Sequence, residues 1–293
     1  MKPKKTVLIL GVTGMLGSTL FRVLNKDPAL EVYGTARLKS AKTFFSKVLA
    51  KNIIVVNDIS SNVSVRSLFQ KTKPDVVINC IGLIKQIIAA NEVLQAIPLN
   101  SLLPHRLALL TKEVSARLIL VSTDCVFSGK KGNYKESDLA DCMDLYGQSK
   151  LLGEVTDEQH VLTIRTSIIG HELRSSQSLV NWFLKQKGSV TGYCKAIYSG
   201  LPTVELANII HAVVLPNLKL SGLYQIASTP ISKHDLLNLI AKTYGKKIGI
   251  SKVNSPKINR SLSYAKFKKQ TGYHPKPWKQ LVKEMHADYQ REK

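Results

Sequence analysis

The sequence has little of what a secreted or membrane-embedded protein needs. Its four cysteines (80, 125, 142 and 194) are scattered and include no CxxC pair, so no disulfide framework is expected. Its longest apolar runs, such as 7–10 and 76–78, are far shorter than the ~18 residues that cross a bilayer. After the basic start only four apolar residues follow, fewer than the ~7–15 of a signal-peptide core. We therefore expect a cytoplasmic protein with reduced thiols and no membrane segment.

Acidic residues are also scarce. The chain has 20 Asp+Glu against 42 Lys+Arg and a net charge of +22, an excess found in proteins that bind polyanions. Between residues 244 and 293 there are 13 basic residues against 3 acidic ones. These lysines are dispersed and no DNA- or RNA-binding motif accompanies them, so we expect no dedicated nucleic-acid partner. The seven histidines form no HExxH or similar ligand pair, and no metal site is expected.

What the 293 residues do contain is an alternation of strand-like and helix-like segments. Near-continuously apolar runs predict strands at 6–10, 31–37, 53–57, 75–80, 117–122 and 161–166. Helical patterns lie between them at 15–25, 63–71, 97–114 and 146–158. This alternation predicts an α/β fold, a Rossmann-like doubly wound parallel sheet. The later part is less regular, with helices expected at 179–187, 204–214, 231–244 and 276–289 and a strand at 222–227.

A glycine-rich loop stands at the first strand-to-helix junction. The spacing Gly11-x-x-Gly14-x-x-Gly17 allows a tight turn, a close approach to a pyrophosphate and close packing of helix on sheet. A merely structural turn is the alternative, but the position favours dinucleotide binding. Thr13, Met15 and Leu16, which lie between and beside the glycines, are expected to contact the same cofactor.

The second predicted strand ends in Arg37 rather than in an acidic residue. A carboxylate there would accept from a free ribose 2′-hydroxyl, whereas an arginine pairs with a 2′-phosphate. The sequence therefore favours NADPH, with NADH as the alternative cofactor, and a solvated surface arginine as the other interpretation of Arg37. Asp58, with Ile59 beside it, follows the third strand, where it either contacts the adenine or caps a helix.

Two segments predict carbonyl chemistry. Tyr146 and Lys150 are four residues apart and so share one helix face. A nearby ammonium stabilises a phenolate, which brings a tyrosine (unperturbed pKa ~10) closer to the range where it exchanges a proton with a carbonyl oxygen. Upstream, Thr123 and Asp124 end the fifth strand, where ligands approach open α/β sheets. Capping of a turn is the alternative role for them.

In combination these segments resemble the extended short-chain dehydrogenase/reductases, and within them the dTDP-4-dehydrorhamnose reductase group. The resembling segments are GVTGMLG (11–17), NCIG (79–82), PLNSLLPHRLA (98–108), STDCVFSG (122–129), YKESD (134–138), YGQSKLLGE (146–154), IRTSIIG (164–170), LPTVELANII (201–210), GLYQIAS (222–228) and RSLSYAKFKKQTGYHPKPW (260–278). The resemblance implies a Thr123, Tyr146 and Lys150 catalytic set. It also implies cofactor contacts at Arg37, Asp58, Cys80, Gly82 and Asn100.

The chain departs from the family pattern in two places. The usual STDYVF is STDCVF, so the small Cys125 replaces an aromatic residue. The usual NDQxGxPT is reduced to AIYSGLPT at 196–203, which loses three polar side chains. Both departures fall in segments with which the family binds its substrate. The resemblance therefore supports the prediction of hydride transfer more strongly than the identity of the sugar.

The resemblance implies that two parts of the chain bind different ligands. Residues 1–168 would form the NADP-binding Rossmann domain, with segments around 197–228 returning to it. Residues 169–293 would form mainly a smaller C-terminal α/β substrate-binding domain. For the substrate we expect contacts at Asp124, Cys125, Trp182, Lys195 and Arg260, with Tyr193 and Arg165 as further candidates near phosphate. For Trp182 and Phe183 a place in the core is favoured over a sugar-binding platform, and a salt bridge is the alternative role of Arg165. Trp278 is expected to anchor the last helix.

The resulting hypothesis is an NADPH-dependent reductase of a nucleotide-linked 4-keto-6-deoxy sugar, acting in nucleotide-sugar and cell-surface polysaccharide biosynthesis. Its substrate partner would be a nucleotide-diphosphate sugar, and a homodimer is one expected assembly. A reductase of a UDP-hexulose or a sugar-nucleotide epimerase is the alternative within the enzymes. A non-catalytic NADP-binding regulatory subunit is the alternative outside them, disfavoured by the intact Thr123, Tyr146 and Lys150.

Overall fold

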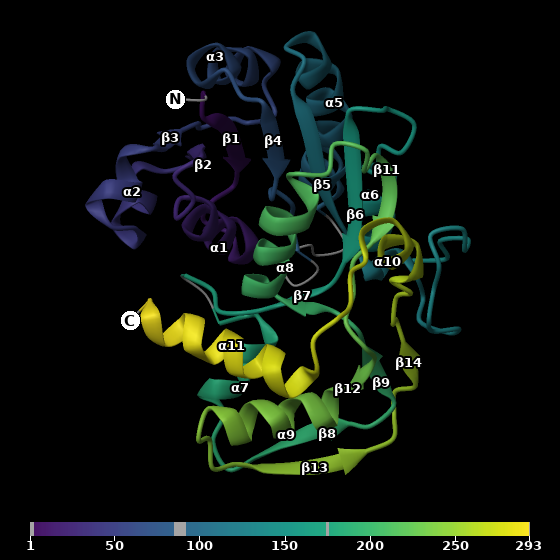
Figure 1. The fold of residues 1–293 in the computed structure, drawn as a ribbon. Helices are drawn as coiled ribbons and strands as arrows, with labels where there is room; N and C mark the ends of the chain where they lie inside the picture. The colour runs from purple at the N-terminus through teal and green to yellow at the C-terminus, as the bar shows by residue number, and fades with distance from the viewer. Residues whose placement is uncertain (1–2, 85–91, 174–175, 293) are drawn as a thin grey trace. The chain divides into compact units, whose positions relative to one another are not determined.

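The computed structural model describes residues 3–84, 92–173 and 176–292 of the chain (Figure 1). The chain forms two compact units. The first unit comprises Met1–Ser122, Asp144–Ile164 and Ala207–Leu223, and the second comprises Thr123–Met143, Arg165–Leu206 and Tyr224–Lys293. The sequence predicts an NADP-binding domain at 1–168 and a substrate-binding domain at 169–293. A division into compact units does not test which ligand each part binds, so both assignments stay predictions.

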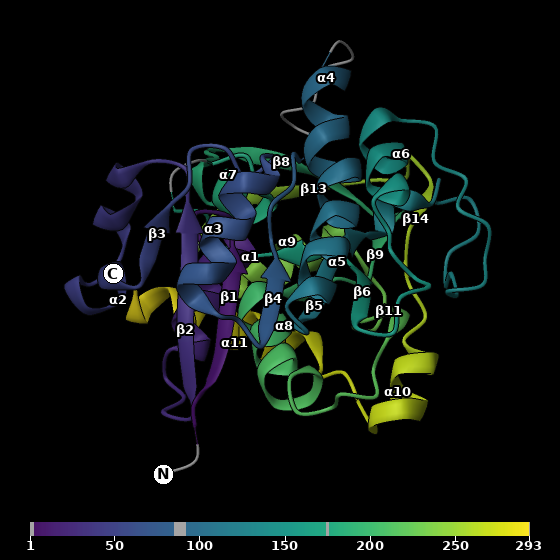
Figure 2. The ribbon, with the colours of Figure 1, turned by 90° about the horizontal axis from the view of Figure 1, so that it is seen from above.

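A seven-stranded sheet has the strand order β11-β6-β5-β4-β1-β2-β3, and Figure 2 shows the strands in this order from one side to the other. Its strands are β1 (Lys5–Leu10), β2 (Leu30–Ala36), β3 (Ile53–Val55), β4 (Val76–Asn79), β5 (Arg117–Thr123), β6 (Val161–Thr166) and β11 (Gly222–Gln225). The pairs β1–β2, β2–β3, β1–β4 and β4–β5 are parallel. Because the order runs outward from β1 in both directions, the sheet is doubly wound, and the predicted α/β fold class is confirmed.

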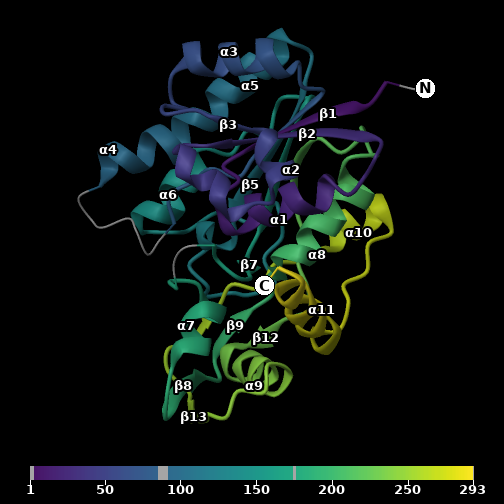
Figure 3. The same ribbon diagram turned by 90° about the vertical axis from the view of Figure 1, so that its left-hand side faces the viewer.

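Helices connect these strands and cover both faces of the sheet. They are α1 (Met15–Leu24), η1 (Lys39–Phe44), α2 (Lys47–Lys51), α3 (Asn62–Thr72), α4 (Val93–Ala96), η2 (Ile97–Leu102), α5 (Leu103–Glu113), η3 (Asp124–Val126), α6 (Leu145–Leu152), α8 (Thr203–Ile209) and η4 (Ile210–Val214). Figure 3 shows α3 and α5 on one side of the strands and α1 on the other. Leu8 of β1, Phe69 of α3 and Leu107 of α5 belong to one cluster of buried hydrophobic residues. Both faces are therefore buried, which is why the strands are so uniformly apolar.

The remaining elements belong mainly to the second unit. They are β7 (Ile168–Ile169), α7 (Leu179–Lys185), β8 (Ser189–Tyr193), β9 (Ala196–Tyr198), β10 (Leu201–Pro202), β12 (Ile231–Ser232), α9 (Lys233–Thr243), β13 (Gly249–Val253), β14 (Ile258–Asn259), α10 (Ala265–Thr271) and α11 (Trp278–Arg291). In Figure 1 the parallel pair β8–β13 runs beneath α9, on which α11 packs. A small sheet of order β12-β9-β14 lies in the same unit. It places the Tyr198 and Arg260 segments next to each other.

Several predicted elements have different limits in the structure. The helix expected at 146–158 ends at Leu152, because Gly153 packs directly against the backbone of Asn100 and the chain turns there. The helices expected at 97–114 and 204–214 each contain a wider, π-helical turn, η2 and η4. The sequence patterns did not predict η1, α2, α10, the five-residue strands β8 and β13, or the two- and three-residue strands of the second unit. Strands of two or three residues contain too few residues for an apolar periodicity to show.

Candidate active site

The glycine loop connects β1 to α1 through a backbone conformation that favours glycine. Gly11 has a φ of +85°, and a side chain at Gly17 would collide with the carbonyl oxygen of Gly11. The loop is fixed to β2 because the Gly11 and Val12 amides donate to the Thr35 hydroxyl and carbonyl at 3.1 and 2.9 Å. Gly14 begins α1 without a side-chain cap, and the first turn of the helix has no acidic residue. The first backbone N–H groups of α1 are thus directed at the loop, an arrangement that suits a phosphate.

At the neighbouring strand end, Arg37 directly follows β2 and is exposed. Asp58 is exposed too, and its carboxylate accepts from the backbone N–H and hydroxyl of Ser60 at 2.9 and 2.6 Å. These two bonds lower the pKa of Asp58, the hydroxyl bond most. Ser61, not Asp58, caps α3, so Asp58 stabilises the turn before the helix. Ile59 packs against the core, and the cofactor contacts proposed for these residues stay predictions.

Helix α6 carries Tyr146 and Lys150 one turn apart, as the spacing predicts. The Asp144 side chain caps the helix by accepting from the Gly147 N–H at 2.9 Å. The Lys150 ammonium donates to the carbonyl oxygen of Val121 in β5 at 2.7 Å, so the lysine side chain is held against the neighbouring strand. Burial lowers the pKa of Lys150 to about 8, while the nearby Glu154 carboxylate opposes that shift. The structure thus gives Lys150 a half-buried position close to the end of β5.

The segment after β4 meets Lys150 at Gly82. A side chain on Gly82 would stand 3.2 Å from the Asn100 amide oxygen and 3.8 Å from the Lys150 nitrogen. Cys80 is also close enough for the Lys150 charge to act on it, and burial raises the pKa of its thiol to about 12. Cys80, Gly82 and Lys150, which the sequence analysis assigns to one cofactor site, are therefore neighbours within the first unit.

Asn100 is buried in η2 and connects this segment to α6. Its amide oxygen accepts from the Leu83 N–H at 2.9 Å. Its amide nitrogen donates to the Leu83 carbonyl at 3.2 Å and to the Ser149 hydroxyl at 3.1 Å. Asn100 was expected as a cofactor contact, but these bonds give it a second role: it fixes the helix that carries Tyr146 and Lys150. Glu154 is a residue that the motif search missed; it accepts from the Ser122 hydroxyl at 2.6 Å, and its position four residues after Lys150 was the available signal.

In the second unit, Thr123 and Asp124 form another cluster. The Thr123 hydroxyl accepts from the Cys125 N–H at 3.1 Å and donates to the Asp124 carboxylate at 3.2 Å. Asp124 is buried, and this burial raises its pKa, while the positive charge of Arg260 opposes the shift. Arg260 is held in place by donating from Nε to the Phe127 carbonyl at 2.8 Å. The fold thus brings Arg260, 136 positions away in sequence, to the predicted substrate residues Asp124 and Cys125.

Other predicted residues are more dispersed. Trp182 is 38% exposed on α7, whereas Phe183 is fully buried, so the favoured assignment of both to the core is wrong for Trp182 and correct for Phe183. Helix α7 buries Val180 and Phe183, three positions apart, and this spacing turns Trp182 outward. Lys195 and Tyr193 are exposed at the end of β8. The indole N–H of the buried Trp278 donates to the Thr229 carbonyl at 2.7 Å at the start of α11, as expected of an anchor. The guanidinium of the buried Arg165 lies over the Phe127 ring, and its phosphate contact stays a prediction.

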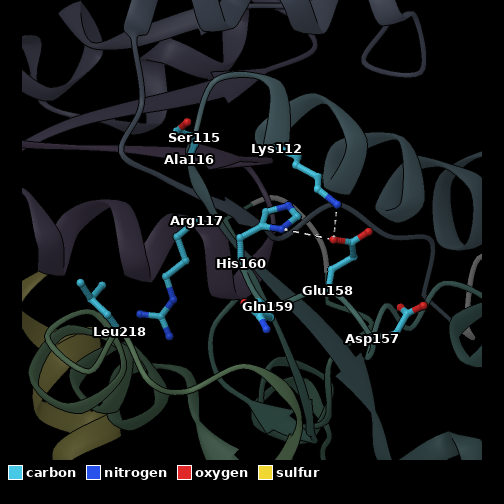
Figure 4. Close-up of a pocket in the computed structure, with 9 residues that line it drawn as sticks. All are labelled: Lys112, Ser115, Ala116, Arg117, Asp157, Glu158, Gln159, His160 and Leu218. Carbon is cyan, nitrogen blue, oxygen red and sulfur yellow. Dashed lines mark hydrogen bonds and ion pairs between the residues drawn. The ribbon is translucent and has the colours of Figure 1, made fainter.

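A cavity of about 560 Å³ lies elsewhere in the first unit (Figure 4). Arg117, which begins β5, and His160, which precedes β6, line it, so it opens at the amino ends of these strands. The glycine loop follows the carboxyl end of β1, which is at the opposite edge of a parallel sheet. Lys112 in the cavity is 2.9 Å from Glu158, and Arg117 donates to the carbonyls of Val214 and Leu220. Lys112 and Arg117 are thus paired with groups of the protein itself. The cavity is separate from the predicted cofactor site at the glycine loop.

Two kinds of feature are absent from the described residues, 3–84, 92–173 and 176–292. These residues contain no group of three or more His, Cys, Asp or Glu side chains arranged to hold a metal ion. They also contain no helix that is long and apolar enough to cross a membrane.

Comparison with known proteins places these features in a family. Methionine adenosyltransferase 2 subunit beta of Danio rerio is 31% identical over 153 residues, 52% of this chain and 43% of that protein, so the chain matches less than half the length of that relative. The dTDP-4-dehydrorhamnose reductase of Aggregatibacter actinomycetemcomitans is 25% identical over 96% of this chain and 98% of its own. The structure of dTDP-4-dehydrorhamnose reductase from Bacillus anthracis in complex with NADP shares the fold, with a TM-score of 0.78, 21% identity and coverage of 97% of this chain and 99% of its own. The model of the RmlD substrate binding domain matches residues 5–291, and the chain belongs to that family.

Proposed function

We propose that the chain is an NADPH-dependent reductase of the keto group of a nucleotide-linked 4-keto-6-deoxy sugar, as in dTDP-4-dehydrorhamnose reduction. The observation that carries this proposal is the placement of Lys150, half-buried and held against β5 one helical turn after Tyr146. Membership of the family and the full-length similarity to a dTDP-4-dehydrorhamnose reductase support the substrate class. The product would serve nucleotide-sugar and polysaccharide biosynthesis.

The residues of the first unit fit NADPH. The uncapped start of α1 and the crowded Gly11–Gly17 turn suit a pyrophosphate, and the exposed Arg37 suits a 2′-phosphate. Gly82 and Asn100 beside Lys150 would border the nicotinamide ribose. When bound, the cofactor supplies a hydride to the carbonyl carbon of the sugar.

Residues of the protein then donate the proton and orient the carbonyl oxygen that receives it. Tyr146 donates its phenolic proton to the carbonyl oxygen as negative charge develops there. The Lys150 ammonium stabilises the phenolate that remains, and its bond to the Val121 carbonyl keeps it in place. Thr123 orients the carbonyl oxygen through its hydroxyl. Because that hydroxyl now donates to Asp124, Thr123 has to exchange this bond for one to the substrate.

The deciding experiment follows the absorbance of NADPH with dTDP-linked 4-keto-6-deoxy sugar as substrate. We expect net oxidation of NADPH, and we expect Tyr146→Phe to lower turnover by ~10²–10⁴-fold with unchanged NADPH affinity. Tyr33→Phe, which removes a hydroxyl that donates to Glu31 at the surface of the first unit, is the matched control. Normal turnover by the Tyr146 variant would refute the assignment.

Two alternatives remain as candidates. A UDP-hexulose reductase would oxidise NADPH only with UDP-linked substrate, and an epimerase would convert sugars without net oxidation, so a panel of dTDP-, UDP- and GDP-linked sugars separates them. The similarity to a methionine adenosyltransferase subunit favours a second function, that of an NADP-binding regulatory subunit. A chain that binds NADPH but reduces no sugar of the panel would support that function.

We also propose a cell compartment, an oligomeric state and a range of partners for the enzyme. We place it in the cytoplasm, where NADPH and nucleotide sugars are available, and we expect a homodimer without a dedicated nucleic-acid partner. Light scattering of the purified chain measures its oligomeric state. Tight binding of mixed-sequence DNA at physiological salt would contradict the exclusion of nucleic acid.

A further inference from the structure

The cavity at the amino ends of β5 and β6 takes no part in the proposed reaction (Figure 4). Its lining residues all belong to the first unit and come from segments 112–117 and 157–160 and from Leu218. Its volume of about 560 Å³ lies in the range of pockets that hold small organic molecules. In a cavity with charged walls, the charges that the protein itself leaves unbalanced decide which ligand fits.

Arg117 brings to this cavity a positive charge that no carboxylate balances. Its guanidinium donates from Nη1 to the Val214 carbonyl at 2.7 Å and from Nη2 to the Leu220 carbonyl at 2.9 Å. Both acceptors are neutral, and within the described ranges of the chain Arg117 has no ion pair. Arg117 is half-buried, and this burial lowers its pKa. The two bonds fix the guanidinium but use only some of its N–H donors, so it is held ready for an anion.

The other charged groups of the cavity decide what kind of anion fits. Lys112 is 2.9 Å from Glu158, so these two charges balance each other. Figure 4 shows Lys112, Glu158 and Asp157 on one side of the cavity, and Arg117 with Leu218 on the other. A dianion such as phosphate would bring excess negative charge toward the two acidic residues, whereas one carboxylate balances Arg117 alone and can pair with it through two parallel bonds. The cavity therefore favours a monoanion.

We propose that this cavity is a second ligand site, which binds the carboxylate of a small organic monoanion through Arg117, with the carbon chain of the ligand against Leu218. Leu218 is 67% exposed and lies two residues before Leu220, whose carbonyl holds Arg117, so apolar surface adjoins the charge. A carbon chain that covers this leucine removes both apolar surfaces from water. Because the glycine loop is at the opposite edge of the sheet, the ligand is a molecule other than the predicted dinucleotide.

The first test follows the Nε–H signal of Arg117 by NMR in the complete chain while butyrate is added. The signal is assigned by its absence from Arg117→Lys. We expect a saturable shift with a Kd on the order of 1 mM, because a ligand of so few atoms gains little affinity. Butylammonium, which has the same carbon chain and the opposite charge, should leave the signal in place. An unsaturable response to butyrate, or an equal response to butylammonium, would overturn the proposal.

The second test places a carboxylate of the protein beside Arg117. Leu218→Glu does so without removing a bond to Arg117, and we expect this internal counter-ion to lower the affinity for butyrate at least tenfold. Leu139→Glu is the matched control, because Leu139 is 87% exposed in the second unit and the substitution changes the net charge of +22 by the same amount. A general attraction of anions to the basic chain would affect both variants alike, so equal affinities would contradict a site at Arg117.

Inorganic phosphate distinguishes a carboxylate site from a phosphate site. We expect phosphate, at a pH where it is a dianion, to move the Arg117 signal only at higher concentrations than butyrate. Tighter binding of phosphate than of butyrate would overturn the choice of a monocarboxylate. These titrations involve neither NADPH nor a sugar, so they decide the role of the cavity even in a chain that reduces no keto sugar.

Discussion

Each unit contains one charged side chain of the predicted site that is shielded from water, Lys150 partly and Asp124 almost fully, and this shielding moves their pKa values in opposite directions. Burial lowers the pKa of Lys150 in the first unit and raises that of Asp124 in the second, because both changes favour the neutral form. The neighbouring groups that oppose the effect of burial on the pKa differ between the two units. Lys150 is assisted by a backbone carbonyl and by Glu154, whereas Asp124 is assisted by hydroxyls and by Arg260. Each site group therefore depends on one neighbour of opposite charge from its own unit.

The largest expected effect is the loss of turnover when Lys150 of the first unit is replaced. Lys150→Met removes the ammonium that stabilises the phenolate, and we expect turnover to fall at least ~10²-fold. Lys112→Met is the matched control, because Lys112 is exposed in the same unit and pairs with Glu158. Steady-state kinetics with both variants measures the effect, and equal activities would remove Lys150 from the mechanism.

The same variant tests the stability of the protein against pH. The pKa of Lys150 is about 8 in the folded chain and 10.5 as its reference value, so between these the unfolded chain binds a proton that the folded chain has lost. The free energy of unfolding should therefore rise with pH from about 8 to about 10.5, and Lys150→Met should abolish that contribution. For Asp124 the sign is reversed, since its folded pKa lies above 3.8: stability falls as pH rises from there through the folded pKa. Urea unfolding across pH of the wild type, the Lys150→Met variant and the Asp124→Asn variant checks both slopes.

A smaller effect is expected from the partner of Asp124. Arg260→Met removes the positive charge beside the carboxylate and leaves the Phe127 carbonyl without its donor. We expect the free energy of unfolding at neutral pH to fall by about 1–3 kcal/mol. Lys195→Met, at an exposed cation of the same unit, should change it by less than about 0.5 kcal/mol. Denaturant titration that ranks the two variants equally would show that Arg260 does not support Asp124.

The smallest expected effect concerns Glu154. Glu154→Gln keeps an oxygen that can accept from Ser122 but removes the negative charge that supports the Lys150 ammonium. The pKa of Lys150 should fall further, so the decline of kcat/KM at alkaline pH should begin at lower pH than in the wild type. A pH–rate profile measures this displacement, and coincident profiles would show that the Val121 carbonyl alone keeps Lys150 charged.

The sequence predicts the large sheet well and the second unit poorly, for a physical reason. Strands such as β1 and β6 are buried on both faces, so they appear as unbroken apolar runs. Strands β9, β12 and β14 are two or three residues long, and their pairing depends on partners far along the chain. A local pattern cannot encode such pairing, and the β9 segment that carries Tyr198 was noticed only as a departure from a family motif.

The same contrast holds within the candidate site. Tyr146 and Lys150 lie on one helix, so their spacing alone predicts that they share a face. The approach of Arg260 to Asp124 requires the whole second unit, and only the family resemblance indicated Arg260 in advance. Asn100 and Asp58 show a further limit: their side chains form internal bonds that a motif does not reveal. The cofactor and substrate contacts themselves stay predictions for the experiments above.

The uncapped start of α1 has a consequence for how the protein responds to its ligands. Since Gly14 offers no side chain to the first turn, that part of the fold is completed only when something else accepts from its backbone. A phosphate-bearing ligand that binds there stabilises the folded chain by mass action, by about 2.7 kcal/mol at a hundredfold excess over its Kd. The melting temperature would then report the concentration of dinucleotide in solution, and the same protein would unfold and be degraded sooner where that dinucleotide runs low.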